Sequence, residues 1–512
     1  MKKTVSILLS FIGAASATLK ASPNTELEEK NDNRQKPNVI IILTDDQGYG
    51  DLSCNGNPVL KTPAIDRLQR ESFNFTNFHV APLSTPTRGQ LITGMDALRN
   101  GAASVLTGRN LLRRDLKTLP QIFKENEYST GIFGKWHLGD NFPDRPMDRG
   151  FNKCIWHKGW GLLSEAEFDN DYYETRYLDS LKVEQSGEFC TNLWFSKAIE
   201  WMSEMHKNGT PFFAYIPLNS PHGPYHAPAQ DYNYYKTRVK DSTTAAFLGM
   251  IKNIDRNFER LERWLDSTGL KNNTIVIFMN DNGGTGGVDL YNAGMRDKKG
   301  SYYEGGHRAI CFLRWPGGEY KNPREINYPA QVQDILPTLI DMLQLKASFH
   351  YKLDGESLIN AIKGKESKER MFVVQYGGNT QPVKSEGCVV YDNWRLVGGD
   401  ELYNILDDPG QTKNIASNNP VIFKKMQIFY EKWWSEVEDS AMNVTPVIIG
   451  SAKENPVIFN SNNWIDNAVN TQWNVALAKG PLRGGTTLLQ VENDGKYIIE
   501  ISRWPFHINR HL

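Results

Sequence analysis

The sequence predicts an α/β fold, a doubly wound sheet of mixed but mainly parallel strands flanked by helices. Four continuous apolar runs recur along the chain, at residues 38–44, 130–134, 212–216 and 275–279. Such runs are typical of parallel strands that are buried on both faces. Amphipathic helical patterns accompany them, at residues 119–127, 192–205 and 247–267. This alternation of strand and helix is the basis of the prediction.

The N-terminus is typical of an export signal. Lys2 and Lys3 precede an apolar run over residues 5–14 and the small-x-small pattern Ala15-Ser16-Ala17. The run is too short to span a bilayer. We therefore predict a signal peptide at 1–17, a polar leader at 18–36, and a periplasmic or secreted protein that uses the export machinery and has no stable membrane insertion.

Composition narrows the possible partners. The 512 residues carry 58 basic and 59 acidic side chains, a formal net charge of −1. Such a balance argues against a general nucleic-acid binder. The five scattered cysteines contain no short metal-binding pair and allow at most two disulfides. The 13 Trp and 21 Tyr residues suit sugar binding as well as core packing.

Polar residues follow each of the four predicted strands. They are Asp45 and Asp46, then Lys135 and His137, then His222, then Asp281 and Asn282. Ligands of doubly wound sheets bind outside the carboxyl ends of the strands, so we expect one shared site. Asp45, Asp46, Asp281 and Asn282 offer the hard oxygen ligands of Ca²⁺, or less favourably Mg²⁺. Either pair taken alone is also explained as a turn.

The same site is predicted to be rich in positive charge. Besides Lys135 and the two histidines, it would include Arg88 and Lys299. This charge exceeds what a neutral substrate needs and indicates a sulfate or phosphate ester, with histidines that can move protons to a leaving alcohol. Ser84 precedes Pro86 and would begin a helix that Gly94 ends. A helix N-terminus favours an anion, although Ser84 taken alone is better explained as an ordinary helix cap.

A second, smaller unit follows the helical pattern at 334–343. Strand patterns at 371–374, 394–397 and 401–404 precede a helical pattern at 421–436. They predict a small antiparallel sheet with one helix. Further strand-like pieces at 456–460, 486–490 and 497–503 indicate a β appendage, which could lack a partner strand. The predicted domains are therefore 37–345 (catalytic), 346–440 (C-terminal subdomain) and 441–512 (appendage).

The motif Ser84-x-Pro86-Thr87-Arg88-Gly89 with Thr93-Gly94 resembles the signature of the formylglycine-dependent, type I sulfatases of the alkaline-phosphatase-like superfamily. Thr87 replaces the commoner serine of that signature. Further matching motifs lie in family order at 44–51, 134–139, 220–224, 281–284, 299–308 and 401–414. The resemblance extends from about residue 37 to residue 439. Serine at position 84 is similar to the bacterial serine-type enzymes of this family.

The resemblance implies a chemistry that the encoded residues alone do not show. Ser84 would be oxidised to formylglycine by a serine-type radical maturation enzyme before export. The hydrated aldehyde would attack sulfur, with Ca²⁺ held by residue 84 and the four oxygen ligands. Implied roles are stabilisation of the nucleophile (Arg88, Lys135), a base (His137), sulfate binding (His222, Lys299) and orientation of Lys299 (Glu304).

The predicted substrate is a sulfated carbohydrate, with His157, Tyr225 and His226 binding sugar hydroxyls at the rim of the pocket. Two other functions remain open from the sequence. One is a phosphomonoester or phosphodiester hydrolase that uses unmodified Ser84. The other is a non-catalytic glycan-binding relative.

Overall fold

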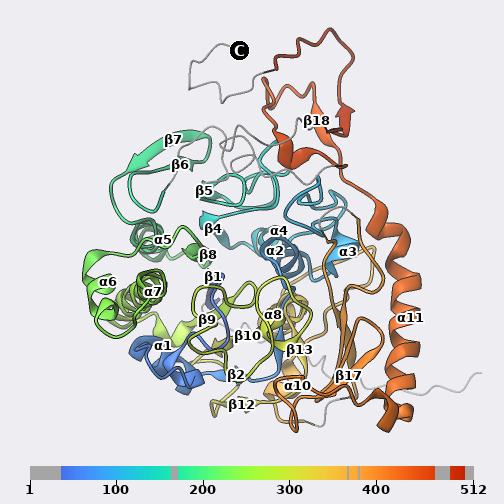
Figure 1. Cartoon of the computed structure of the whole chain (residues 1–512). Coiled ribbons are helices and arrows are strands. Elements are labelled where there is room, and N and C mark those ends of the chain that lie inside the picture. Colours follow the sequence, from blue (N-terminus) through green and yellow to red (C-terminus); the bar gives the residue numbers. More distant parts are fainter. Residues whose placement is uncertain (1–35, 163–170, 366–367, 379–380, 467–484, 502–512) are drawn as a thin grey trace, which may run out of the picture. The chain divides into compact units, whose positions relative to one another are not determined.

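A computed structural model describes residues 36–162, 171–365, 368–378, 381–466 and 485–501 (Figure 1). The predicted signal peptide and all of the leader except Lys36 lie outside these residues. From Lys36 onward the chain forms one compact unit.

A ten-stranded sheet forms the centre of this unit, in the order β12-β2-β11-β9-β1-β8-β4-β5-β6-β7. Its five central strands run parallel and include all four predicted ones: β9 (Thr274–Asn280), β1 (Asn38–Asp45), β8 (Phe212–Pro221), β4 (Ser129–Lys135) and β5 (Lys153–His157). The antiparallel neighbours are β11 (Cys311–Arg314), β6 (Thr175–Asp179) and β7 (Lys182–Ser186). At the far edge, β2 (Phe73–Phe75) pairs with β11 antiparallel and with β12 (Arg324–Ile326) parallel. The predicted fold class is confirmed.

Strand β1 shows why the central runs are apolar at every position. Val39, Ile41 and Leu43 face one core, and Ile40 and Ile42 face another, because successive side chains alternate across a sheet. The first core is closed by α2 (Ser84–Thr93), α4 (Leu119–Glu125) and α9 (Ile335–Leu343). The second is closed by α1 (Pro63–Arg70), α5 (Cys190–Lys207) and α7 (Ser242–Ser267). Helices on both faces of the sheet exclude water from the two cores.

The predicted helices are present, and local capping sets several of their ends. Thr118 and Gln121 form a capping box at the start of α4. Helix α7 begins at Ser242, five residues before the predicted start, because Asp241 accepts a hydrogen bond from the Thr244 backbone N–H. The shorter α-helices of this part of the chain are α3 (Ala97–Asn100), α6 (Ala229–Lys236), α8 (Glu304–His307) and α10 (Ile359–Ile362).

The C-terminal subdomain is the predicted antiparallel sheet with one helix. Its strands are β14 (Met371–Val374), β15 (Cys388–Tyr391), β16 (Trp394–Val397) and β17 (Glu401–Asn404), and α11 (Pro420–Met442) packs against them. Beyond it, β18 (Val447–Ile449) pairs with β19 (Leu489–Val491). The strands predicted at 456–460 and 497–503 are wrong over their described residues, which are irregular. These segments are too exposed to gain the burial that a sheet partner would supply.

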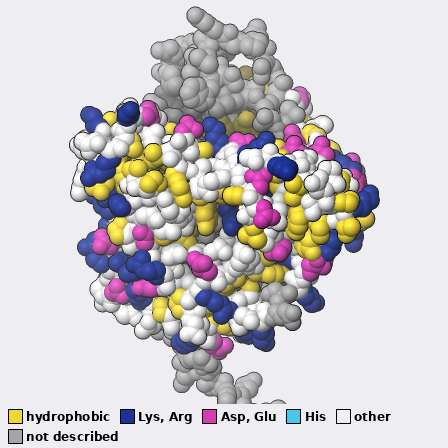
Figure 2. All heavy atoms as spheres, turned by 60° about the horizontal axis from the view of Figure 1, so that its bottom comes forward, with side chains coloured by type: hydrophobic (Ala, Val, Ile, Leu, Met, Phe, Trp, Pro, Cys, Tyr) yellow, Lys and Arg dark blue, Asp and Glu magenta, His cyan; other side chains and the backbone are white. Residues whose placement is uncertain are grey.

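Charge and apolar surface are mixed on the exterior. Basic and acidic side chains are interspersed on the face in Figure 2. Among the described residues, no helix combines the length and hydropathy needed to cross a bilayer. All five cysteines are described as free thiols, so none of the disulfides that the sequence allowed is formed.

A buried ion pair joins the C-terminal sheet to the main body. Arg395 on β16 donates from Nε to Glu304 Oε2 at 2.8 Å and from NH2 to Asn77 Oδ1 at 2.9 Å. Neither Arg395 nor Glu304 is more than 3% exposed in its side chain. Burial by itself raises the pKa of Glu304, but Arg395 and Arg308 hold it well below its ordinary value of 4.5. Glu304 therefore stays ionised at neutral pH.

We expect Arg395→Met to lower the free energy of unfolding by about 3 kcal/mol, because it removes one of the two arginines that pair with the buried Glu304 carboxylate and leaves only Arg308. Since the pKa of Glu304 is depressed in the folded state, the stability from this pair is present above pH 4.5 and is lost as the pH falls. Urea unfolding measures the change. Lys384→Met is the control, because its partner Glu431 is 63% exposed and such pairs contribute under about 1 kcal/mol. Equal losses in the two variants would contradict the prediction.

His79, Glu304 and His307 lie close enough together to suggest a metal centre. Their polar atoms instead bind protein groups. The two Nδ1 atoms are 2.9 Å apart, His79 Nε2 lies 2.9 Å from Asn77 Oδ1, and His307 Nε2 lies 3.1 Å from a backbone carbonyl oxygen. The carboxylate is engaged by Arg395. This cluster joins the small sheet of β10 (Arg308–Ala309), β3 (Phe78–His79) and β13 (Ala330–Gln331) to β16.

Candidate active site

Ser84 is the first residue of α2, and its hydroxyl points at the ends of two central strands. Its Oγ lies 3.1 Å from Asp45 Oδ1 and 3.1 Å from Asn282 Oδ1. No side chain caps this helix, so the interpretation of Ser84 as a helix cap is wrong. Gly94, at φ 68°, ends α2 in the left-handed region as predicted. The helix therefore presents Ser84 to the strand ends.

Three carboxylates meet at this point. Asp45 and Asp46 end β1, and Asp281 follows the neighbouring β9. Each offers an oxygen within 4.8 Å of the others, and none is more than 4% exposed. The backbone N–H of Asp46 donates to Asp281 Oδ1 at 3.1 Å. Asp46 adopts φ 67°, a conformation that non-glycine residues rarely take and that occurs often at functional sites.

Each carboxylate is paired with one cation. Lys135 Nζ lies 2.6 Å from Asp45 Oδ2, Arg88 NH2 lies 2.8 Å from Asp281 Oδ2, and Lys299 Nζ lies 2.5 Å from Asp46 Oδ1. These three ion pairs contain three negative and three positive charges, so their formal charges sum to zero.

Burial lowers the pKa of Lys135, whereas Asp46 raises the pKa of Lys299 above its ordinary value despite burial. Both lysines lie deep in the strand-end cluster, with side chains 1% and 22% exposed. They supply fixed positive charge at the base of the site.

The donor set fits a divalent cation. Each of the three carboxylates binds its cationic partner through one oxygen. The second oxygen of Asp45 lies beside Ser84 Oγ, that of Asp281 accepts the Asp46 backbone N–H, and that of Asp46 lies 3.8 Å from His222 Nε2. Burial raises the pKa of Asp281, and Asp45 raises it further, which is the cost of gathering carboxylates in the interior. A bound cation would remove that cost. Asn282 Oδ1 adds a neutral oxygen ligand, as Ca²⁺ and Mg²⁺ sites commonly use.

The two predicted histidines differ in their surroundings. His222 places Nε2 3.8 Å from Asp46 Oδ2 and bonds the Gly223 carbonyl through Nδ1 at 2.7 Å. His137 is 3% exposed and adopts φ 62°. Burial lowers the pKa of His137 well below 6.5, and Lys135 lowers it further. His137 is therefore neutral at pH 7 and able to accept a proton.

Two predicted roles are contradicted. His157 does not line the rim: it is 1% exposed, contacts Thr175 Oγ1 at 3.1 Å and packs edge-on against Trp194. His157 ends β5 at the same edge of the sheet, but its side chain turns into the core, where burial lowers its pKa to about 3. Glu304 does not orient Lys299, because its carboxylate binds Arg308 and Arg395.

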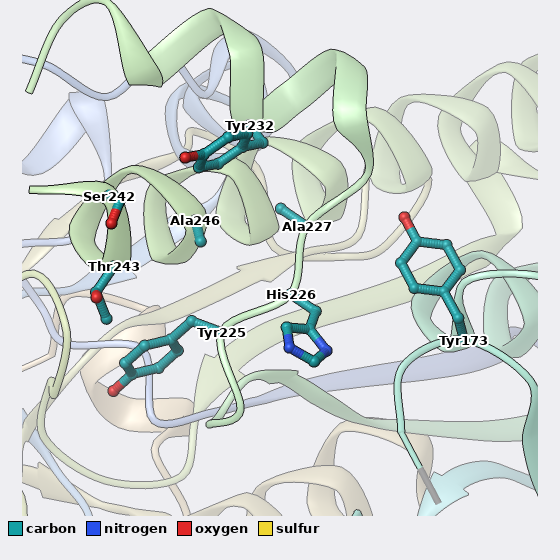
Figure 3. Close-up of a pocket in the computed structure, with 8 residues that line it drawn as sticks. All are labelled: Tyr173, Tyr225, His226, Ala227, Tyr232, Ser242, Thr243 and Ala246. Carbon is teal, nitrogen blue, oxygen red and sulfur yellow. The ribbon is translucent and has the colours of Figure 1, made fainter.

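Tyr225 and His226, the other predicted substrate residues, lie in the loop after His222 and line an open hollow of about 550 Å³ (Figure 3). Sequence reasoning missed the residue that holds this loop. The Tyr172 hydroxyl lies 2.7 Å from the Asn219 carbonyl oxygen and 2.6 Å from that of His222. Tyr172 is distant in sequence, so no local pattern reveals this contact.

Sequence reasoning also missed the position of the chain after α11. Asn460, Asn462 and Asn463 line a narrow cavity of about 20 Å³ together with His137, enough for about one water molecule. Glu454 fixes this segment by accepting a hydrogen bond from the Phe142 backbone N–H at 2.6 Å. The segment beyond the predicted catalytic domain thus forms part of the wall beside His137.

Buried fixed cations, clustered oxygen ligands and a hydroxyl at a helix N-terminus define a hydrolase of oxyanion esters on an alkaline-phosphatase-like fold. Residues 37–345 match the family model described as Sulfatase. The chain belongs to the sulfatase family and is a sulfuric ester hydrolase.

Its relatives include Arylsulfatase J of Mus musculus, 26% identical over 434 residues that cover 78% of this chain and 71% of the relative. Another is the N-acetylgalactosamine-6-O-sulfatase of Bacteroides thetaiotaomicron, 26% identical over 509 residues, with coverages of 80% and 95%. Among solved structures, Ps i-CgsB in complex with k-i-k-neocarrahexaose is similar with a TM-score of 0.72 and 25% identity, covering 80% of this chain and 95% of that one.

Proposed function

We propose that this sulfatase removes sulfate from a sulfated carbohydrate, with a hydrated formylglycine derived from Ser84 as nucleophile and Ca²⁺ as the bound cation. The observation that carries the proposal is the position of Ser84 Oγ, 3.1 Å from both Asp45 Oδ1 and Asn282 Oδ1. The oxygen stands among proposed metal ligands at a helix N-terminus, where positive charge favours an ionised hydroxyl.

Formylglycine at position 84 would supply, as its hydrate, the hydroxyl that attacks sulfur, and the bond between sulfur and the leaving alcohol oxygen would break. Arg88 and Lys135 would stabilise the ionised oxygen, since both are buried and fixed by the carboxylates of Asp281 and Asp45. Loss of a proton from the second hydroxyl would then release sulfate and restore the aldehyde, and we assign that proton to His137 because its Nδ1 is buried without a hydrogen-bond partner among the described residues.

Asp45, Asp46, Asp281, Asn282 and residue 84 would hold the cation, which supplies positive charge for the sulfate oxygens. Lys299 and His222 bind the sulfate from the Asp46 side. His222 is the better placed of the two to protonate the leaving oxygen, because its side chain is 32% exposed, whereas Lys299 is 22% exposed and held by Asp46 at 2.5 Å.

Hydrolysis of a phosphate ester by unmodified Ser84 is not favoured. A simple serine nucleophile needs a base within hydrogen-bond distance. The described partners of Ser84 Oγ are a carboxylate whose pKa stays low and an amide oxygen. Burial raises the pKa of Asp45, but Lys135 and neighbouring cations lower it more, so Asp45 is a weak base. This argues against a phosphoesterase that uses unmodified Ser84, and the complete charged site argues against a non-catalytic relative.

A carbohydrate substrate is proposed from the relatives, one of which is named for N-acetylgalactosamine 6-sulfate and one of which was solved with a neocarrahexaose. Export to the periplasm or beyond, and maturation by a serine-type radical enzyme before export, complete the proposal.

Peptide mass spectrometry across residue 84 tests the mechanism. Protein co-produced with a serine-type maturation enzyme should show loss of two hydrogens at Ser84, and its activity on an aryl sulfate should scale with the modified fraction. Protein produced without that enzyme is the matched control and should be unmodified and inactive. Full activity in the unmodified protein would overturn the formylglycine proposal.

A further inference from the structure

The hollow lined by Tyr225 and His226 is formed partly by the loop that carries His222. Tyr225 and His226 follow His222 in the same loop and line the hollow. Burial raises the pKa of Tyr225, and a side-chain hydrogen bond with Thr285 lowers it. Thr285 in turn lies 3.4 Å from the Asp46 carbonyl oxygen. Thr285 therefore links Tyr225 to the Asp46 end of the proposed sulfate site.

Aromatic rings surround this hollow. Figure 3 shows Tyr225, Tyr232 and Tyr173 around it, with His226 between Tyr225 and Tyr173. Tyr173 is 40% exposed, so its ring is available to a ligand. The volume of about 550 Å³ lies within the usual range for small-molecule pockets. Aromatic faces combined with a few polar tips suit the flat apolar face and hydroxyl edge of a sugar ring.

The polar groups of the hollow are suited to hydroxyls rather than to anions. Its lining includes Ser242 and Thr243 at the start of α7 but contains no lysine or arginine. His226 Nδ1 is paired with Asp171 Oδ1 at 2.8 Å. A carboxylate at the edge of the hollow accepts hydrogen bonds from hydroxyls and repels a second sulfate or a uronate. Arg88, Lys135 and Lys299 belong to the strand-end site, and at the hollow Lys236 Nζ lies 5.6 Å from the centroid of the Tyr232 ring.

The hollow is also held in a defined position relative to the site. Tyr172 binds the carbonyls of Asn219 and His222, and its neighbours Asp171 and Tyr173 belong to the hollow. Tyr225 packs edge-on against Phe247 of α7 at 5.4 Å. The same short segments therefore fix both His222 and the aromatic wall.

We propose that this hollow is a subsite for a neutral, unsulfated sugar ring linked to the sulfated one, so that the enzyme acts on oligosaccharides in preference to monosaccharides. The proposal rests on the proposed carbohydrate sulfatase function. Tyr225 and Tyr232 supply stacking faces, Tyr173 closes the outer side, and the His226–Asp171 pair binds hydroxyls. None of these side chains takes part in the attack on sulfur.

The test compares three substrates in matured wild-type protein and in Tyr173→Ala and Tyr232→Ala. The first is an aryl sulfate. The second is a set of sulfated monosaccharides that includes N-acetylgalactosamine 6-sulfate. The third is the set of corresponding oligosaccharides, in which a neutral sugar is linked to the sulfated one. We expect each variant to lose about tenfold in kcat/KM on the oligosaccharide, from one lost ring contact, and less than about twofold on the other two. Tyr391→Ala, on the C-terminal sheet, is the matched control and should change none of them.

The outcomes separate the two proposals. Equal losses on all three substrates, or no loss on the oligosaccharide, overturn the subsite. Hydrolysis of the aryl sulfate without hydrolysis of any saccharide overturns both the subsite and the carbohydrate function while leaving the sulfatase activity. A readout independent of catalysis is saturation-transfer NMR with the desulfated oligosaccharide. Its signal should be present in the wild type and lost in Tyr232→Ala; equal signals would overturn the subsite.

Discussion

Ser84→Ala is expected to lose roughly four orders of magnitude or more in kcat/KM on any sulfate ester, as enzymes do when the nucleophile is removed. The variant removes the Oγ atom on which the proposed formylglycine would be built. It should keep its fold, because Ser84 is 2% exposed and alanine fits the first turn of α2 without a clash. Single-turnover kinetics with a fluorogenic aryl sulfate measures the loss, and thermal unfolding measures the fold.

Ser104→Ala is the matched control for this variant. Ser104 is also a buried serine, 1% exposed, and its hydroxyl donates to the Gly378 carbonyl at 2.7 Å. Its loss should cost about 1 kcal/mol of stability, the net contribution of a typical hydrogen bond, and should leave kcat/KM unchanged. A Ser84→Ala protein that keeps more than about one per cent of wild-type activity is incompatible with a nucleophile at this position.

Loss of the cation has the second largest expected effect. Treatment with EDTA should abolish activity and lower the melting temperature by several degrees, because a ligand that binds the folded state at a thousandfold excess over its Kd contributes about 4 kcal/mol. Added Ca²⁺ should restore both. The physical reason is that Asp45, Asp46 and Asp281 gather three carboxylates in the interior with oxygens within 4.8 Å of one another.

Asp281→Asn separates the cation from general effects of chelation. It keeps the shape of the side chain but removes one ligand charge and the partner of Arg88. We expect at least about a hundredfold loss of activity together with reduced Ca²⁺ content by elemental analysis. Asp179→Asn, which breaks a half-exposed pair with Lys153, should alter neither. Unchanged metal content in Asp281→Asn, or EDTA resistance of the wild type, would show that these carboxylates do not hold a cation.

Agreement between prediction and structure is greatest where one residue pattern has one physical meaning. The run from Asn38 to Thr44 could be nothing but a strand buried on both faces, and β1 is such a strand. The end of α2 at Gly94 follows from glycine's access to the left-handed region. Agreement is poorest in the chain after α11, where short strand-like pieces depend on partners that the local sequence does not specify.

The site shows the same division. Strand ends of a parallel sheet meet at one edge, so the sequence alone was enough to bring Asp45, Lys135, His222 and Asp281 into one cluster. The sequence alone could not predict the direction in which each of these side chains points. His157 ends β5 just as Lys135 ends β4, and the two are paired in register. Lys135 reaches Asp45, whereas His157 packs against Trp194 on α5.

The sequence by itself determined the fold class, the positions of the central strands and the set of charged residues at their carboxyl ends. These features depend on periodicity and on residue type, which are local. Only the tertiary structure decided that Glu304 serves Arg395, that Tyr172 holds the His222 loop, and that Tyr173 and Tyr232 share a hollow with Tyr225. These contacts join segments far apart in the chain, and their energies depend on burial and geometry that exist only once the core has packed.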